Sequence, residues 1–182
     1  MALAAGIPKS RIVTFERCQK INGDVGGREF ASSFGIFEKE KPAFALVRVY
    51  PRHGEPKTLA AAAFWSDHGA VLLGLPPLEC NGKHEQKYIV ASVEGRNFLF
   101  SMPVEKAHTD LIWTLRGMVG NDAGMEGGGF LSIWNNTTPD LSGKSGTFNV
   151  NDVTTEARNA LSPFLRFWDD FTIFRKEAGF LQ

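Results

Sequence analysis

The segment 59–100 constrains the fold more than any other part of the chain. It opens with the alanine-rich run Leu59–Trp65 and continues into two further apolar runs, Ala70–Leu75 and Tyr88–Val93. Alanine has the highest intrinsic helix propensity and Gly69 suits a C-terminal cap, so we expect a helix over Leu59–Trp65. The two later runs are short and bounded by Pro or Gly, which favours strands. A helix feeding short strands predicts a mixed α/β fold.

The rest of the chain adds strands on both sides of this segment. Alternating or continuous apolar residues predict strands at Arg11–Arg17, Phe44–Tyr50 and Phe130–Trp134. Between them, Gly117–Gly129 contains six glycines, which indicates a mobile loop or a surface that another backbone approaches closely.

Two more helices are expected in the second half. Ser101 as cap and Pro103 in the first turn predict a helix that runs to about Met118. A final helical region is expected from about Thr155 to Ala178, interrupted near Ser162-Pro163 and capped by Gly179. Its aromatic residues recur every three or four positions, a spacing that more often reflects core packing than a partner groove.

Length and composition favour a single domain over 1–182. Its parts would be N-terminal strands with a basic face (1–54), a central core (55–118), and a Gly-rich loop, strand and C-terminal helices (119–182). No run of 18 apolar residues occurs, so membrane insertion is not expected. The two cysteines, Cys18 and Cys80, are expected to be reduced thiols, which indicates a cytoplasmic location.

Charge is unevenly distributed although the net charge is zero. Residues 1–60 hold ten Lys or Arg against six Asp or Glu, and residues 61–182 hold ten against fourteen. We therefore expect no whole-molecule attraction to nucleic acid. A local basic face that includes Arg11, Arg17 and Arg28 could hold a DNA backbone; the alternative is an ordinary solvated surface.

No strong catalytic signature is present, and no metal ligands can be assigned. Glu85 and Lys87 match the acidic-x-Lys half of a metal-dependent nuclease pattern, with Asp67 eighteen residues upstream. Carboxylates in that pattern hold Mg²⁺ while the lysine orients water. The pattern is short, and a chance match is the main alternative.

The tripeptide Glu94-Gly95-Arg96, followed by Asn97, ends an apolar run. An arginine beside a glycine at a strand end can present a cation and backbone N–H groups to a phosphate. The alternative is a turn whose arginine pairs with a nearby carboxylate.

The order of these motifs resembles the ParB/sulfiredoxin superfamily. The resemblance rests on an expected helix over Leu59–Gly69, on Pro77-Leu78-Glu79-Cys80, and on the run Tyr88–Arg96, which together cover about forty residues. It implies a ParB/sulfiredoxin-like core, a small mixed sheet flanked by helices, followed here by a C-terminal helical segment. Two departures stand out: Asn97 replaces a second arginine, and Pro103 interrupts the helix expected next.

Within that superfamily, the chain is similar to plasmid fertility-inhibition factors. The resemblance implies an ATPase and deoxyribonuclease that blocks DNA transfer through a type IV secretion system, with ATP as cofactor and Mg²⁺ as an optional metal. It assigns nucleotide binding to Gly95, Arg96 and Asn97, and catalysis to Arg96 with Glu94, Glu85 and Lys87. The implied partners are DNA bound without sequence preference, a nucleotide and a component of the secretion system.

Two other classes of function stay open, so an enzymatic activity is favoured but not settled by the sequence. The chain could be a non-enzymatic inhibitor that docks on a protein of a secretion or defence system through Trp65, Trp134 and Phe180, since aromatic residues anchor interfaces. A redox enzyme that uses Cys18 or Cys80 is the third class.

Overall fold

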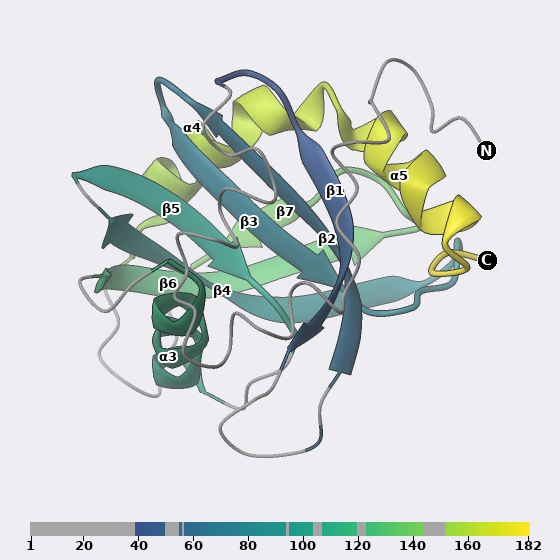
Figure 1. The fold of residues 1–182 in the computed structure, drawn as a ribbon, viewed down its shortest axis with the longest axis horizontal. Coiled ribbons are helices and arrows are strands. Elements are labelled where there is room, and N and C mark those ends of the chain that lie inside the picture. The colour runs from purple at the N-terminus through teal and green to yellow at the C-terminus, as the bar shows by residue number, and fades with distance from the viewer. Residues whose placement is uncertain are drawn as a thin grey trace.

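The computed structural model describes residues 39–49, 55, 57–93, 95–103, 107–119, 123–143 and 152–182. These residues form a mixed α/β fold with one seven-stranded sheet and three helices (Figure 1). The elements are β1 Ala43–Val49, β2 Lys57–Ser66, β3 Gly69–Leu75, β4 Lys83–Val93, β5 Arg96–Ser101, α3 His108–Val119, β6 Gly124–Trp134, β7 Asp140–Ser142, α4 Thr154–Leu165 and α5 Trp168–Glu177. The predicted α/β class is confirmed.

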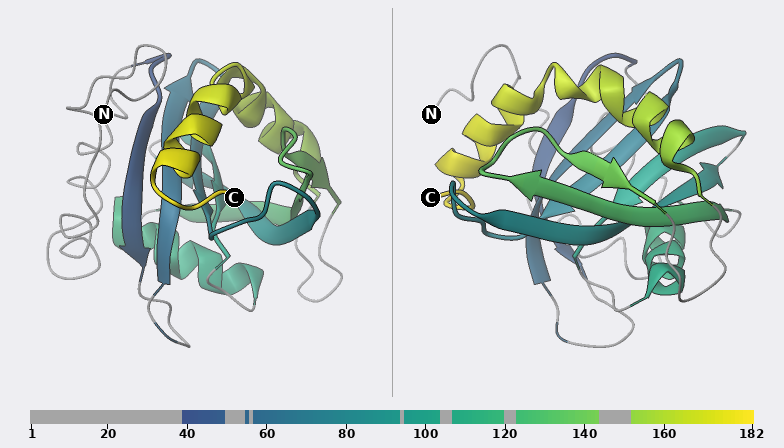
Figure 2. Two further views of the ribbon diagram at one scale, coloured as in Figure 1. Left: turned by 90° about the vertical axis from the view of Figure 1, so that its right-hand side faces the viewer. Right: turned by 180° about the vertical axis from the view of Figure 1, so that it is seen from behind.

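The sheet has the order β1-β2-β3-β5-β4-β6-β7. Only β3 and β5 run parallel, and every other neighbouring pair is antiparallel. The helices α4 and α5 cover one face and α3 packs on the other, as the right-hand view of Figure 2 shows with α4 and α5 above and α3 below. The strand predicted at Arg11–Arg17 lies outside the described residues.

The helix expected over Leu59–Trp65 is wrong, because this run is the middle of β2. It pairs with β1 on one side and β3 on the other, and its alanines are at most 1% exposed. The run has no polar face, so a helix here would need apolar cover on all sides. Alanine's helix advantage of about 0.5 kcal/mol per residue is outweighed by two complete hydrogen-bonded ladders and by burial of Leu59 and Phe64, worth about 1.5–3 kcal/mol each.

Of the two interpretations of Gly117–Gly129, the mobile loop is wrong for 124–129, which belong to β6, and the surface of close backbone approach is confirmed there. Two of its glycines are required by close approach. A Cβ on Gly128 would lie 2.6 Å from the Tyr88 carbonyl oxygen and 2.7 Å from the His108 ring, and one on Gly129 would lie 2.8 Å from the Tyr88 hydroxyl. Glu126 is the extra residue of a β-bulge opposite Val90 and Ala91. These glycines therefore leave room for side-chain and backbone atoms of β4 and α3 to pack closely against β6.

The remaining predictions hold with shifted boundaries. Phe44–Tyr50 corresponds to β1, Ala70–Leu75 to β3, and Phe130–Trp134 to the end of β6. Ser101 belongs to β5 and does not cap a helix, so α3 starts at His108. The final helical region is present, and Gly179 follows it with φ 78°.

The break in the final helical region falls later than expected. Pro163 lies inside α4, and the chain turns at Arg166 and Phe167. Phe167 packs on Phe64 there, with ring centroids 5.5 Å apart. The turn at these residues separates α4 from α5, and both helices pack on the same face of the sheet.

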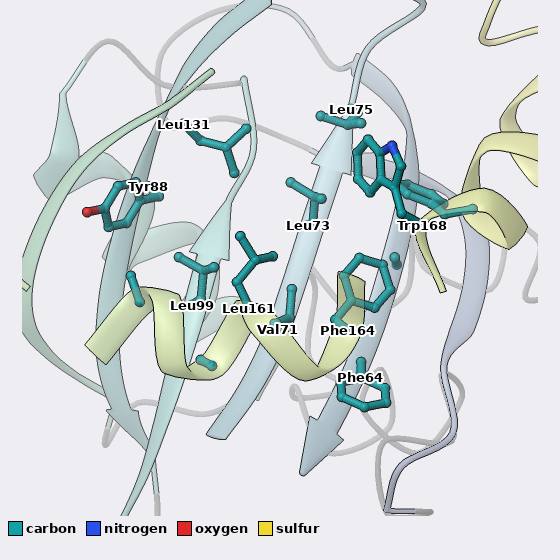
Figure 3. Close-up of a cluster of buried hydrophobic side chains, with 14 of the residues drawn as sticks. Phe64, Val71, Leu73, Leu75, Tyr88, Leu99, Leu131, Leu161, Phe164 and Trp168 are labelled. Carbon is teal, nitrogen blue, oxygen red and sulfur yellow. The ribbon is translucent and has the colours of Figure 1, made fainter. Parts of the chain in front are cut away.

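The larger core lies between the sheet and α4 and α5 (Figure 3). Phe44 stacks on Phe171 with ring centroids 5.2 Å apart, and Phe64 packs against Phe164 at 5.9 Å. The aromatic stripe of the C-terminal helices is thus core packing. Small residues in β2, and Ala160 of α4, allow the helix to pack closely on the sheet.

Candidate nucleic-acid interface

Several residues proposed from the sequence lie outside the described parts of the chain. These are Arg11, Arg17 and Arg28 of the basic face and Glu94 of the phosphate motif. Their roles stay predictions.

Gly95 lies in the tight two-residue connection between β4 and β5, and Arg96 is the first residue of β5. Arg96 pairs with Val93 across two intervening residues, and Gly95 has φ 75°, a conformation that glycine adopts without strain. The Arg96 guanidinium lies over the Trp65 ring, 3.9 Å from its centroid, and Asn97 is exposed. The glycine is therefore explained by the turn, and the arginine by its stacking on Trp65.

Asp67 lies near this turn and not near Glu85. Its carboxylate pairs with Lys39 at 2.5 Å, and the hydrogen bond from Lys39 lowers the Asp67 pKa, with smaller contributions that include Arg96. Asp67 belongs to the β2–β3 turn, next to the residues that pair with the start of β5. The sequence-based pairing of Asp67 with Glu85 is not present in the structure.

Arg96 and Lys87 are too far apart to contact one phosphate. Arg96 lies opposite Val93, and Lys87 is six residues further along β4. At about 3.4 Å per residue that is about 20 Å. Among the described residues assigned to catalysis, Arg96 at the start of β5 therefore lies apart from Glu85 and Lys87 on β4.

Glu85 and Lys87 belong to a partly exposed surface of the β4–β6 pair, on which Lys87, Phe130 and Ser132 are half-buried. We call this surface the ribbon face. It consists of Lys83, Glu85 and Lys87 on β4 and Phe130, Ser132 and Trp134 on β6, paired in the order Lys83–Trp134, Glu85–Ser132 and Lys87–Phe130.

The ribbon face alternates with a buried face. Of the residues between its members, Gln86, Leu131 and Ile133 are at most 5% exposed, and His84, near the outer end, is half-buried. Trp134 is 55% exposed, which is unusual for so large an apolar side chain. Further along the same side of β4, Ile89 and Ala91 pack with the α3 core. The ribbon face is thus the part of this side of β4 that α3 does not cover.

Contacts within the ribbon face combine cations with aromatic rings. The Lys83 ammonium lies 5.0 Å from the Trp134 ring centroid and 3.4 Å from the Glu85 carboxylate. The Ser132 hydroxyl donates to the same carboxylate at 3.2 Å. Along β4 the charged side chains are spaced by about 7 Å, and Phe130 and Trp134 lie about 13 Å apart along β6.

The inner end of the ribbon face is fixed by His108, at the start of α3. Its Nε2–H donates to the Gly129 carbonyl at 2.8 Å, and its ring packs edge-on against Phe130. Burial lowers the His108 pKa, and the charge of Lys87 lowers it further, against the hydrogen bond to Gly129. His108 is therefore neutral near pH 7, with the proton on Nε2. Beside it, a cavity of about 240 Å³ is lined in part by Glu85, Lys87 and Phe130.

A buried polar network supports the ribbon from behind. The Gln86 side-chain amide donates to the Gly74 carbonyl at 3.0 Å and to the Ser101 hydroxyl at 2.8 Å, and Ser101 donates to the Lys87 carbonyl. The network forms at the end of β5, the strand that lies between β3 and β4. Beyond this end, no described strand fills the space between β3 and β4. The Gln86 side-chain oxygen can only accept, so His84 Nε2–H donates to it at 2.7 Å.

The ATP and Mg²⁺ sites that the resemblance implies stay predictions, since Glu94 lies outside the described residues. No group of three His, Cys, Asp or Glu side chains among them could hold a metal ion, and Glu85 is already paired with Lys83 and Ser132. We therefore derive no step through Mg²⁺ or ATP.

Sequence reasoning named Trp134 as an aromatic anchor of a binding surface, but it missed Phe130 and the pairing of both residues with the charged residues of β4. The alternation in 83–87 and in 130–134 was available as a signal, but the pairing of these segments depends on the register between β4 and β6. Comparisons with protein-family models, with characterised proteins and with solved structures found no match to this chain. None of the described helices is long and apolar enough to cross a membrane.

Proposed function

We propose that the protein binds single-stranded DNA, without sequence preference, on the ribbon face. The observation that supports this is the pairing of an exposed tryptophan with a lysine above its ring at the outer end, and of Phe130 with Lys87 at the inner end. Aromatic rings that stack on bases, next to cations that follow the backbone, are the common elements of such surfaces.

The two aromatic side chains would act as stacking positions. Every base has an aromatic face, so stacking on Trp134 and Phe130 does not distinguish sequences. Lys83 and Lys87 would contact phosphates, which positions a strand without reading it. Glu85 reduces the local positive charge, which favours weak and reversible binding.

The charge of the surface sets an expected salt dependence. With two lysines on the ribbon face, the slope of log K against log salt should be about −1.4 for a single strand. A much steeper slope would indicate a larger basic surface. The net charge of zero agrees with a local contact.

The test is a fluorescence-anisotropy titration of labelled oligothymidine of about 20 nucleotides. Trp134→Ala should raise Kd roughly 5- to 150-fold, because loss of one stacked base costs about 1–3 kcal/mol. Trp113→Ala is the matched control: Trp113 is 53% exposed and also lies near a cation, with Arg116 5.5 Å from its ring, but it belongs to α3. Equal effects of the two substitutions, or no binding by the wild type, would refute the proposal.

DNA cleavage is a second candidate, because Glu85 and Lys87 lie two residues apart on the same exposed face. Gel assays of single-stranded and plasmid DNA, with and without Mg²⁺ and ATP, should then show cleavage that Glu85→Gln abolishes. The block of plasmid transfer through a type IV secretion system, and the ParB/sulfiredoxin-like core, rest on the sequence resemblance alone. If Trp134→Ala leaves DNA binding unchanged but abolishes binding to a protein partner, the inhibitor hypothesis replaces both candidates.

A further inference from the structure

A cavity lies beside the inner end of the ribbon face. It has a volume of about 240 Å³, and the described residues of its lining come from β4, β6 and the segment after β5: Glu85, Gln86, Lys87, Met102, Pro103 and Phe130. Half of these residues also belong to the ribbon face. Because sites for drug-sized ligands measure about 300–1,000 Å³, this cavity suits a single nucleobase better than a whole nucleotide.

The cavity crosses β4, with β6 on one side and the segment after β5 on the other. Phe130 is paired with Lys87 on the first side, and Ser101, the residue before Met102, is paired with Tyr88 on the second. Neighbouring strands lie about 4.8 Å apart, so the backbones of the two walls are separated by about 10 Å. A nucleic-acid strand on the ribbon face would therefore pass directly beside the cavity.

Two apolar side chains of the lining are held in place by the fold. Phe130 packs edge-on against the His108 ring, with ring centroids 5.6 Å apart. Met102 is 1% exposed and belongs to the core between the sheet and α3. Walls that are already ordered lower the entropic cost of holding a ligand. The cavity is thus prepared for a flat, largely apolar group such as a base.

Glu85 brings a carboxylate to the same cavity. Both contacts that it makes with described residues use Oε2, which lies 3.4 Å from the Lys83 ammonium and accepts from the Ser132 hydroxyl at 3.2 Å. A carboxylate only accepts hydrogen bonds, and its two oxygens offer about four lone-pair positions. Oε1 is therefore available to accept from N–H donors of a ligand.

Guanine has the base edge that best complements this carboxylate. Its N1–H and N2 amino groups are adjacent donors with no acceptor between them. Adenine and cytosine present an amino group next to a ring nitrogen that accepts, and thymine presents one N–H between two carbonyls. A carboxylate that pairs with those edges also faces an acceptor, and such a mismatch costs binding free energy.

We propose that the cavity beside Phe130 receives one unstacked guanine from a single strand on the ribbon face, and that Glu85 selects this base. The unstacked bases of single strands can be hydrogen-bonded along their Watson–Crick edges in this way. The inference rests on the proposed binding of single-stranded DNA. It adds a preference at one position to a surface that otherwise binds without regard to sequence.

The test is a fluorescence-anisotropy titration of the full chain with three labelled strands of equal length. They are oligothymidine, alternating thymidine and deoxyguanosine, and alternating thymidine and deoxyinosine. The base of deoxyinosine is guanine without the N2 amino group, so it keeps the ring system and N1–H but loses one of the two donors.

The guanine strand should bind about threefold more tightly than oligothymidine, and the inosine strand should fall between them. A well-paired base edge contributes about fivefold at the lower end of its range, which suits a carboxylate whose side chain is 47% exposed to competing water. Only half of the binding registers place a guanine in the cavity, which reduces the observed ratio to about threefold.

Glu85→Ala should abolish the difference between the guanine and inosine strands, because the acceptor is gone. Glu79→Ala is the matched control: it removes the same charge from an exposed residue that lines a different cavity, so the wild-type ratio should persist. Trp134→Ala should weaken all three strands by a similar factor, since stacking on Trp134 does not depend on the base.

Two results would overturn the inference and leave the proposed function standing. One is a wild type that binds oligothymidine but shows equal Kd values for the guanine and inosine strands. The other is a Glu85→Ala variant that keeps the wild-type ratio between these strands. A wild type that binds none of the three strands would refute the proposed function and the inference together.

Discussion

Replacement of Gly128 by alanine should destabilise the protein through one steric contact that the structure defines. The added Cβ would lie 2.6 Å from the Tyr88 carbonyl oxygen and 2.7 Å from the His108 ring, whereas ordinary contacts begin at 3.4 Å. Either β4 or the start of α3 must therefore move by about 0.8 Å. Overpacking of this size costs about 1–3 kcal/mol.

Gly124 provides the matched control, because it lies in the same strand and an added Cβ there meets nothing within 4 Å. Both substitutions reduce the freedom of the unfolded chain by a similar amount, about 0.4–1 kcal/mol, so this contribution cancels in the comparison. Urea unfolding should give Gly128→Ala a free energy of unfolding about 1–3 kcal/mol below that of Gly124→Ala. A difference under about 0.5 kcal/mol, which is typical of neutral surface changes, would refute the placement of α3 against β6.

Three further outcomes are expected. Gln86→Leu should lower the free energy of unfolding by about 1–3 kcal/mol, because the Gly74 carbonyl loses its buried donor; urea titration that shows no loss would contradict the network. The free energy of unfolding should fall as pH drops below 6.5, because burial lowers the His108 pKa in the folded state and the unfolded state then binds the extra proton. His108→Gln should flatten this dependence below about pH 6.5, the ordinary pKa of histidine, and equal slopes would refute it. Arg96→Ala should change stability by less than about 1 kcal/mol in the same titration, because its stacking on Trp65 is exposed.

Local patterns in the sequence predicted a good part of the fold. Phe44–Tyr50 and Ala70–Leu75 are strands because their continuous apolar residues suit a sheet buried on both faces. The aromatic spacing of 164–174 correctly indicated helices packed on a core, and Gly179 takes the left-handed conformation expected after a helix. These features depend on neighbours within a few residues.

Predictions failed where distant parts of the chain decide the outcome. The alanines of Leu59–Trp65 favour a helix in isolation, but β1 and β3 supply hydrogen-bonding partners on both edges. The glycines of β6 indicate a loop in isolation, but they serve the close approach of Tyr88 and His108. The first helix on which the resemblance to the ParB/sulfiredoxin superfamily rests is absent for the same reason.

The candidate site shows the same division. The sequence by itself determined the alternation of charged residues at Lys83, Glu85 and Lys87, because side chains two positions apart share a face of any strand. Only the tertiary structure decided that Trp134 and Phe130 lie beside them, and that Arg96 lies about 20 Å from Lys87 along β4. The register between strands more than forty residues apart depends on the packing of both sheet faces, and no local pattern encodes it.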